Sequence, residues 1–149
     1  MRWMLEVQKI KSNRLLQVDG LSVSFVTRNG IVRAVNDVSF TVDKGNTTAI
    51  IGESGSGKSV SCYSLLGLIP SPPGRIDSGI AIFDGEDLLK LNERRLRDIR
   101  GRRISMIFQD PMTCLNPFMT VGKQIAEPLI YHDRVRRRRA RDLSLELLR

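Results

Sequence analysis

Gly52-Glu53-Ser54-Gly55-Ser56-Gly57-Lys58-Ser59 fits the pattern G-x-x-x-x-G-K-[ST] at every fixed position, and this stretch decides the fold. The apolar run Thr47 to Ile51 precedes it, and the helix-compatible run Val60 to Leu68 follows it. A loop that cradles phosphates requires this strand–loop–helix context, which a chance match in a flexible Gly/Ser linker would lack. The sequence therefore predicts a nucleotide site.

The residue types in this loop explain its chemistry. Its glycines let the backbone aim successive N–H groups at one phosphate, and the following helix adds the positive end of its dipole. Lys58 is placed to reach the β- and γ-phosphates, and the Ser59 hydroxyl is placed to bind Mg²⁺. We expect the metal to be held largely through the nucleotide.

The flanking sequence predicts the rest of the architecture. Two stretches of alternating apolar residues precede the loop, from Leu16 to Phe25 and from Ile31 to Val42, joined by a turn at Arg28-Asn29-Gly30. Further strands are predicted at 47–51, 78–83 and 104–108, and helices at 58–68, 93–100, 121–131 after a Thr120 cap, and 134–148 after an Asp133 cap. The predicted fold class is α/β, a P-loop NTPase core with an N-terminal antiparallel β-layer. Residues 1–14 are expected to be an irregular lead-in, and residues 15–149 the N-terminal part of a nucleotide-binding domain.

Composition excludes several classes of protein. With 149 residues, 41% hydrophobic and 27% charged, the chain has the composition of a globular domain rather than a disordered one. No apolar run approaches the roughly 20 residues that span a bilayer, and the N-terminus lacks the features of a secretory signal. Cys62, Cys114 and the single His132 do not have the spacing of a zinc site.

The net charge of +8 is concentrated near the C-terminus, where Arg136 to Arg139 are consecutive. A nucleic-acid or lipid-headgroup patch is one interpretation of this run. We favour the solvated face of an amphipathic helix whose other face holds Val135, Ala140, Leu143 and Leu147. No nucleic-acid-binding motif accompanies the arginines, so no nucleic-acid partner is expected.

The phosphate loop alone leaves kinases, GTPases and transport ATPases open. Two further segments narrow the choice: Ile107-Phe108-Gln109-Asp110-Pro111-Met112-Thr113, and the run from Leu115-Asn116-Pro117 to Glu127. With these segments and 82–88, the chain from Leu15 onward closely resembles the ATP-binding subunits of ABC transporters. It is most similar to importers of dipeptides, oligopeptides and related solutes such as nickel or glutathione. Cys114 stands where the resemblance leads us to expect serine.

The resemblance implies roles for individual residues. Residues 52–59 would bind ATP. Gln109 resembles the Q-loop glutamine, whose amide approaches Mg²⁺ and the attacking water. Phe25 aligns with the aromatic residue that stacks on adenine, although its place in an alternating strand equally suits core packing.

Four features of the family do not occur within these 149 residues: the signature segment, the magnesium-site aspartate, the water-activating glutamate and the switch histidine. Leu143-Ser144-Leu145-Glu146 has no glycine and is not the signature, and His132 is misplaced for the switch. The chain looks like the front part of such a subunit, an ATPase by family that is expected to turn over little ATP by itself.

The resemblance further implies a second ATP-binding subunit, transmembrane permease subunits, and a peripheral location on the cytoplasmic side of the plasma membrane. The leading function is the ATP-binding subunit of a peptide-type importer. The alternative is a non-catalytic nucleotide-binding or regulatory remnant of such a subunit. A DNA-repair ATPase of the same superfamily would need zinc or coiled-coil insertions, and the sequence shows none.

Overall fold

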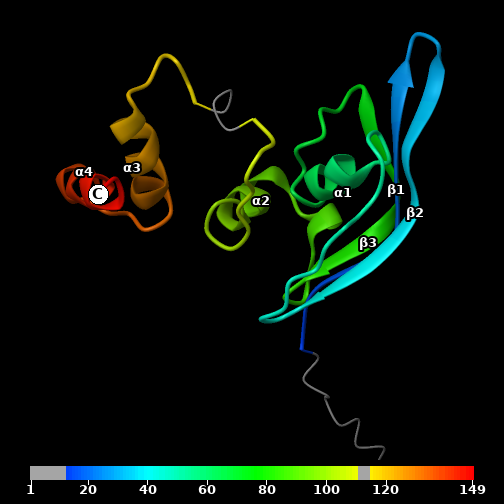
Figure 1. Cartoon of the computed structure of the whole chain (residues 1–149), viewed down its shortest axis with the longest axis horizontal. Coiled ribbons are helices and arrows are strands. Elements are labelled where there is room, and N and C mark those ends of the chain that lie inside the picture. Colours follow the sequence, from blue (N-terminus) through cyan, green and yellow to red (C-terminus); the bar gives the residue numbers. More distant parts are fainter. Residues whose placement is uncertain (1–12, 111–114) are drawn as a thin grey trace, which may run out of the picture. The chain divides into compact units, whose positions relative to one another are not determined.

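The computed structural model describes residues 13–110 and 115–149. The chain divides into two compact units, one ending at Leu91 and the other spanning Asn92–Arg149 (Figure 1). Most of the expected lead-in, and Cys114, lie outside the described residues, while Arg14 is already the first residue of a strand.

The first unit is built on a four-stranded antiparallel sheet in the order β2-β1-β3-β4. Strands β1 (Arg14–Thr27) and β2 (Gly30–Asp43) form the predicted hairpin, in which Thr27 pairs with Gly30 beside the turn. Strand β3 (Gly74–Phe83) pairs with the other edge of β1, and the short β4 (Glu86–Asp87) pairs with β3. The predicted antiparallel layer is confirmed, and β3 adds a third long strand to it.

Helix α1 (Lys58–Leu65) packs on this sheet and carries the phosphate loop at its start. Leu65 and Leu66 are buried at its end, and the 3₁₀ helix η1 (Leu88–Lys90) buries Leu88. The strands contribute the other buried apolar residues of this unit: Val18, Leu21, Val23, Val35, Ala81 and Phe83. Each large aliphatic or aromatic side chain buried in this way contributes about 1.5–3 kcal/mol. The core of the first unit therefore lies directly behind the loop.

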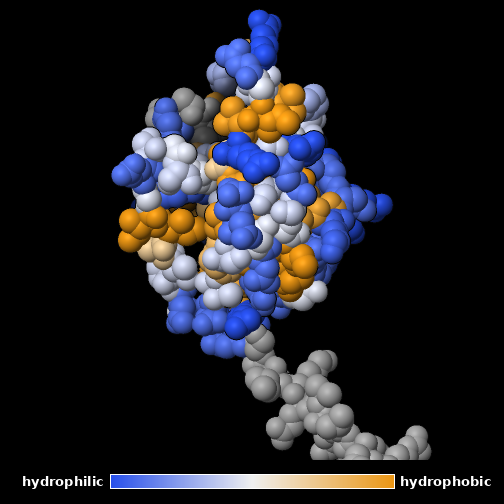
Figure 2. All heavy atoms as spheres, turned by 90° about the vertical axis from the view of Figure 1, so that its right-hand side faces the viewer, coloured by the Kyte–Doolittle hydropathy of each residue, from blue (hydrophilic) through white to orange (hydrophobic). Residues whose placement is uncertain are grey.

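Some apolar side chains of the hairpin reach the surface. Val26, Ile31 and Val32, next to the turn, are each more than half exposed. Figure 2 faces the side of the hairpin and shows apolar patches between hydrophilic side chains. Single exposed apolar residues of this kind are normal on a protein surface.

The second unit is helical, with α2 (Glu93–Ile99), α3 (Val121–Tyr131) and α4 (Arg137–Leu147). Helix α2 is capped by Asn92, whose side chain accepts a hydrogen bond from the Arg95 N–H at 2.9 Å, and it buries Leu96 and Ile99. Helices α3 and α4 pack together, and a small alanine on each is buried, Ala126 and Ala140.

The caps of the last two helices differ in how well they were predicted. Thr120 is the N-cap residue of α3, although its side chain makes no capping hydrogen bond. Asp133 was wrongly predicted to cap the last helix, because the chain first turns through Arg134 at φ 52° and the helix is capped by Arg136. Leu147 is also 72% exposed, so it does not belong to the buried face expected of α4.

Two predicted strands do not form. Residues 47–51 have no regular structure and Ile51 is 93% exposed, while residues 104–108 contribute only one isolated bridge, between Arg100 and Ile104. A strand exists only through hydrogen bonds to a neighbouring strand. In the part of the chain that the structure describes, neither segment has such a neighbour.

Candidate functional site

The loop from Gly52 to Ser59 is a tight backbone turn that leads directly into α1. The Ser56 N–H donates to the Glu53 carbonyl at 3.2 Å, and Gly55 and Gly57 take positive φ angles of 80° and 89°. Gly57 is the N-cap residue of α1, and no side chain caps the helix. Because the first N–H groups of a helix have no partner within it, those at the start of α1 remain available to an anion.

The glycine at position 57 is required by its surroundings as well as by its φ angle. A Cβ atom added there would collide with the carbonyl oxygen of Ala34 in β2, and it would also contact the Val35 side chain at 3.4 Å. The loop therefore lies directly against the second strand. This contact fixes the loop on a rigid element, as a preorganised binding site requires.

Lys58 extends back across the loop. Its Nζ donates to the Gly52 carbonyl at 2.7 Å, to the Glu53 carbonyl at 2.5 Å and to the Ser56 hydroxyl at 3.2 Å. All three acceptors are neutral, and no carboxylate among the described residues forms an ion pair with this ammonium. The structure therefore holds an uncompensated positive charge over the loop, where a phosphate would supply the missing negative charge.

The other predicted loop residues fit the same arrangement. Gly52 to Ser56 are exposed, Lys58 is half-buried, and Ser59 is exposed in the first turn of α1. A Cβ at Gly52 would lie 2.6 Å from the Ser56 hydroxyl oxygen, so the loop closes tightly on itself. The structure thus brings residues 52–59 together as one cradle, and the Ser59 hydroxyl is accessible at its edge.

Phe25 lies in β1, in the same unit as the loop. It pairs with Val32 of β2 and with Gly74 of β3, and its ring edge would lie 3.1 Å from a Cβ at position 74. Val32 is two residues from Ala34, which touches Gly57, so Phe25 stands on the strands that support the loop. It is half-buried. Adenine stacking and core packing both remain compatible with this position.

Gln109 belongs to the second unit, on the segment after residues 104–108. It is exposed and has no regular secondary structure, and its predicted role stays a prediction. Residues 111–114 of the loop that follows it lie outside the described residues.

Three features of the described residues bear on metal binding and on membrane insertion. No cluster of three or more His, Cys, Asp or Glu side chains suited to a metal ion occurs among the described residues. Cys62 is a half-buried free thiol on α1. Within the described ranges, no helix combines the length and apolar character needed to cross a bilayer.

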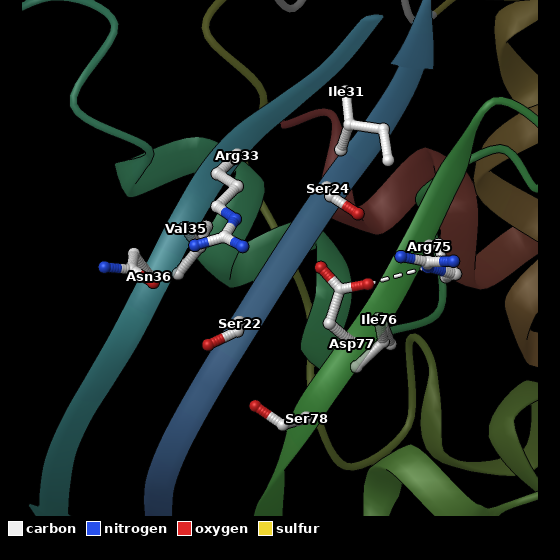
Figure 3. A pocket seen from close by; sticks show the side chains of 10 residues that line it. All are labelled: Ser22, Ser24, Ile31, Arg33, Val35, Asn36, Arg75, Ile76, Asp77 and Ser78. Atoms are coloured by element: carbon white, nitrogen blue, oxygen red, sulfur yellow. Dashed lines mark hydrogen bonds and ion pairs between the residues drawn. The ribbon is translucent and has the colours of Figure 1, made fainter.

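Sequence reasoning missed a polar hollow on the sheet. It has a volume of about 660 Å³, and Figure 3 shows it across β2, β1 and β3, with α1 behind the strands. Ser24 of β1 pairs with Arg33 on one side and with Arg75 on the other. Asp77 accepts a hydrogen bond from the Arg75 Nε at 2.7 Å. Arg33, Ser24 and Arg75 thus form a row of polar side chains across the three strands. In the sequence, only the period-two spacing of polar residues along these strands could have indicated this row.

Two arginines and one carboxylate line this hollow, and one of the arginines, Arg75, is paired with Asp77. The pKa of the Asp77 carboxyl lies below its ordinary value, mainly because of the Ser24 hydroxyl and to a smaller extent because of Arg75. The Ser24 hydroxyl is buried beside Asp77. This hollow therefore has the character of a surface ion network rather than of a second phosphate site.

Comparison with known proteins gives a consistent result. Residues 35–147 match the family described as ABC transporter. The oligopeptide transport ATP-binding protein OppD of Bacillus subtilis is 50% identical over 139 residues, which cover 93% of this chain and 39% of that protein. The dipeptide transport ATP-binding protein DppD of the same organism is 47% identical over 135 residues, covering 91% of this chain and 40% of that protein.

Solved structures agree with this in fold. The ATP-binding cassette MJ0796, in a dimeric post-hydrolysis state bound to ADP and Pi, superposes with a TM-score of 0.72 at 23% identity. The match covers 88% of this chain and 54% of that one. The chain therefore spans about two fifths of the curated relatives it matches, as the 39% and 40% coverages show, and about half of this solved cassette.

Proposed function

This chain belongs to the ABC transporter family, and we propose that it is the ATP-binding front part of a subunit that powers the import of peptides or related small solutes. One observation carries the proposal: the Lys58 ammonium lies over a backbone cradle with neutral partners only. Such an arrangement favours the terminal phosphates of a nucleotide over any uncharged ligand.

The residues present fit ATP and Mg²⁺. The cradle leaves no room for a Cβ at Gly57, and it places free N–H groups at the start of α1. Lys58 would exchange its carbonyl partners for phosphate oxygens, and the backbone N–H groups would hold the phosphates in place. The Ser59 hydroxyl would bind Mg²⁺, which, when bound, neutralises the charge that develops on the transferred phosphoryl group.

The resemblance implies roles for two further residues. Gln109 would position water and Mg²⁺ through its side-chain amide, as its resemblance to the Q-loop implies. Phe25 would offer one face of its ring to adenine. Its place on the strands that support the loop favours this role, because those strands also position Gly57.

In the assembled transporter we propose two ATP-binding subunits and membrane-embedded permease subunits as partners, on the cytoplasmic side of the membrane. The names of the relatives, which describe oligopeptide and dipeptide transport ATP-binding proteins, support this proposal. So does the dimeric form of the solved cassette.

Hydrolysis needs a group that activates water, and the resemblance assigns that role to none of these 149 residues. The second candidate function is a non-catalytic nucleotide-binding or regulatory remnant of such a subunit, which would bind ATP without turnover. A phosphate-release assay on the 149-residue chain tests the second candidate. We expect a rate far below about 1 s⁻¹, the lower end of ordinary enzyme turnover; a rate above that would exclude the second candidate.

Binding of a fluorescent ATP analogue tests the leading proposal. Lys58→Ala should weaken binding at least about tenfold, because it removes the charge that meets the phosphates. Lys44→Ala is the matched control, since Lys44 is an exposed lysine of the same unit whose ammonium lies 3.8 Å from Asp84. If the parent and Lys58→Ala chains bind equally well, or neither binds, the proposed function is wrong.

A further inference from the structure

Positive charge is distributed very unevenly between the two units. From Asn92 to Arg149 the chain has fourteen Arg and Lys residues against seven Asp and Glu residues, so this unit carries +7 of the total charge of +8. An excess of this size attracts anions to the surface of the unit. The phosphate loop does not account for it, because the loop belongs to the other unit.

Part of this charge surrounds a hollow between α2 and the end of α3. The hollow has a volume of about 470 Å³, and four arginines line it together with Asp98 and His132: Arg95, Arg102, Arg103 and Arg134. Asp98 is the only acidic residue among the described residues that line it. The lining therefore carries three more positive than negative charges with His132 neutral, within a space of the size of a small ligand.

Two of these arginines stand out. Arg102 and Arg134 form no ion pair with any carboxylate of the described residues. Since neighbouring like charges repel, a lining of this kind is more stable when an anion enters it.

The backbone holds these groups in place. Arg134 has a φ of 52°, a conformation that few residues other than glycine adopt. Hydrogen bonds fix the turn on both sides of it, from the His132 N–H to the Pro128 carbonyl at 2.8 Å and from the Val135 N–H to the Leu129 carbonyl at 3.1 Å. Arg134 therefore reaches the hollow from an ordered turn.

His132 is held in the same place. Its ring meets the Tyr131 ring edge-on, with centroids 4.9 Å apart, and its Nε2 would lie 3.4 Å from a Cβ at Gly101. The imidazole therefore lines one side of the hollow.

We propose that this hollow binds a phosphate group, either on the headgroup of an anionic phospholipid or as free phosphate. Guanidinium groups recognise phosphate through paired N–H···O bonds, and several of them converge here. A phosphate also offers more charge and more acceptor oxygens than a carboxylate, which suits a lining in which Arg102 and Arg134 have no acidic partner among the described residues. The proposal concerns the second unit alone and does not depend on the nucleotide site.

His132 is the only histidine of the chain, so its imidazole NMR signals report on this hollow and not on the phosphate loop. Titration of the whole chain with inorganic phosphate should shift these signals along a saturating curve. In the double variant Arg102→Gln/Arg134→Gln the apparent affinity should fall at least about tenfold. The control Arg138→Gln/Arg139→Gln removes the same charge from α4, outside the hollow, and should retain the parent affinity.

Vesicles distinguish the two sources of phosphate. If the chain sediments with phosphatidylglycerol vesicles but not with phosphatidylcholine vesicles, and only the hollow variant loses this binding, the ligand is a lipid headgroup. If phosphate saturates the hollow while both variants sediment like the parent, the ligand is soluble phosphate. A shift that does not saturate, equal losses in the two variants, or equally tight binding of an oligoglutamate peptide would each overturn the proposal.

Discussion

At the scale of single residues, Gly57 combines two constraints. Its φ of 89° is unfavourable for any side chain, and the Ala34 carbonyl occupies the space that a Cβ would need. At Gly55, by contrast, φ is 80° and an added Cβ would meet nothing within 4 Å. Comparing substitutions at Gly55 and Gly57 therefore separates the effect of the backbone angle from the effect of the collision.

We predict that Gly57→Ala lowers the free energy of unfolding by about 2–4 kcal/mol, since strain at such a position costs about 1–3 kcal/mol and the collision adds to it. Gly55→Ala should cost only about 1 kcal/mol, from the angle alone. Urea denaturation of the two variants measures the difference. Equal losses would show that the Ala34 carbonyl does not constrain the loop.

The phosphate loop was predictable from sequence because its determinants are local. Gly52, Gly57, Lys58 and Ser59 lie within eight residues, and the same short segment supplies the turn, the cation and the start of the helix. The support of Gly57 by Ala34 could not be predicted in this way, since it joins positions 23 residues apart through the packing of the loop on β2.

At the scale of secondary-structure elements, Asp87 joins β3, β4 and η1. Its carboxylate accepts hydrogen bonds from the N–H groups of Ala81 at 3.1 Å and Leu89 at 3.3 Å, and it lies 2.9 Å from the Lys90 Nζ. Burial alone would raise the pKa of this carboxyl, but the bonds from Lys90, Ala81 and Leu89 outweigh it and leave the pKa below its ordinary value. The ionised form is therefore the one that the fold stabilises.

Asp87→Asn should lower the free energy of unfolding at pH 7 by about 1–2 kcal/mol, because bonds to a charged acceptor become bonds to a neutral one. Since the folded pKa is depressed, the stabilisation is complete above the unfolded pKa of about 3.8 and is lost as the pH falls through the folded value. Denaturation curves between pH 7 and pH 2.5 should therefore converge for parent and variant. Asp84→Asn, at an exposed pair 3.8 Å from Lys44, should change little at any pH.

The segment before α3 is held by one side chain. The Gln124 amide oxygen accepts from the Asn116 N–H at 2.9 Å, while its Nε2 donates to the carbonyls of Asn116 and Met119, both at 3.0 Å. Gln124→Glu keeps the acceptor but loses both donors, so hydrogen exchange at the Met119 and Asn116 amides should become faster. Gln124→Ala should speed it further. Unchanged exchange in both variants would show that the helix alone orders this segment.

The helices and the hairpin were predicted better than the remaining strands, for a physical reason. The partner of β1 follows it after a two-residue turn, so alternation and a turn signal suffice to predict the pair. Residues 47–51 and 104–108 have the apolar composition of central strands, but a strand of that kind needs neighbours on both sides. The sequence predicts that such a segment has a propensity to form a strand. It does not identify the neighbouring strand with which the segment would pair.

For the molecule as a whole, these two segments matter because they leave large apolar side chains in water. Ile51 is 93% exposed and Ile107 is 94% exposed, and both lie on backbone that pairs with no strand among the residues the structure describes. Exposed apolar segments with unpaired N–H and C=O groups are a template for association with other chains. The net charge of +8 opposes this association, so it should grow as salt screens the repulsion.

We therefore predict that the 149-residue chain binds a hydrophobic dye and that its mass by light scattering rises with protein concentration, more steeply in 0.5 M salt. Ile51→Lys/Ile107→Lys should reduce both signals severalfold, because lysine on an unpaired edge blocks strand addition. Leu145→Lys/Leu147→Lys adds the same charge at exposed positions of α4, where the backbone is hydrogen-bonded within a helix, and it should leave most of the association intact. If the two double variants reduce association equally, charge rather than strand pairing controls it, and the unpaired segments are not its cause.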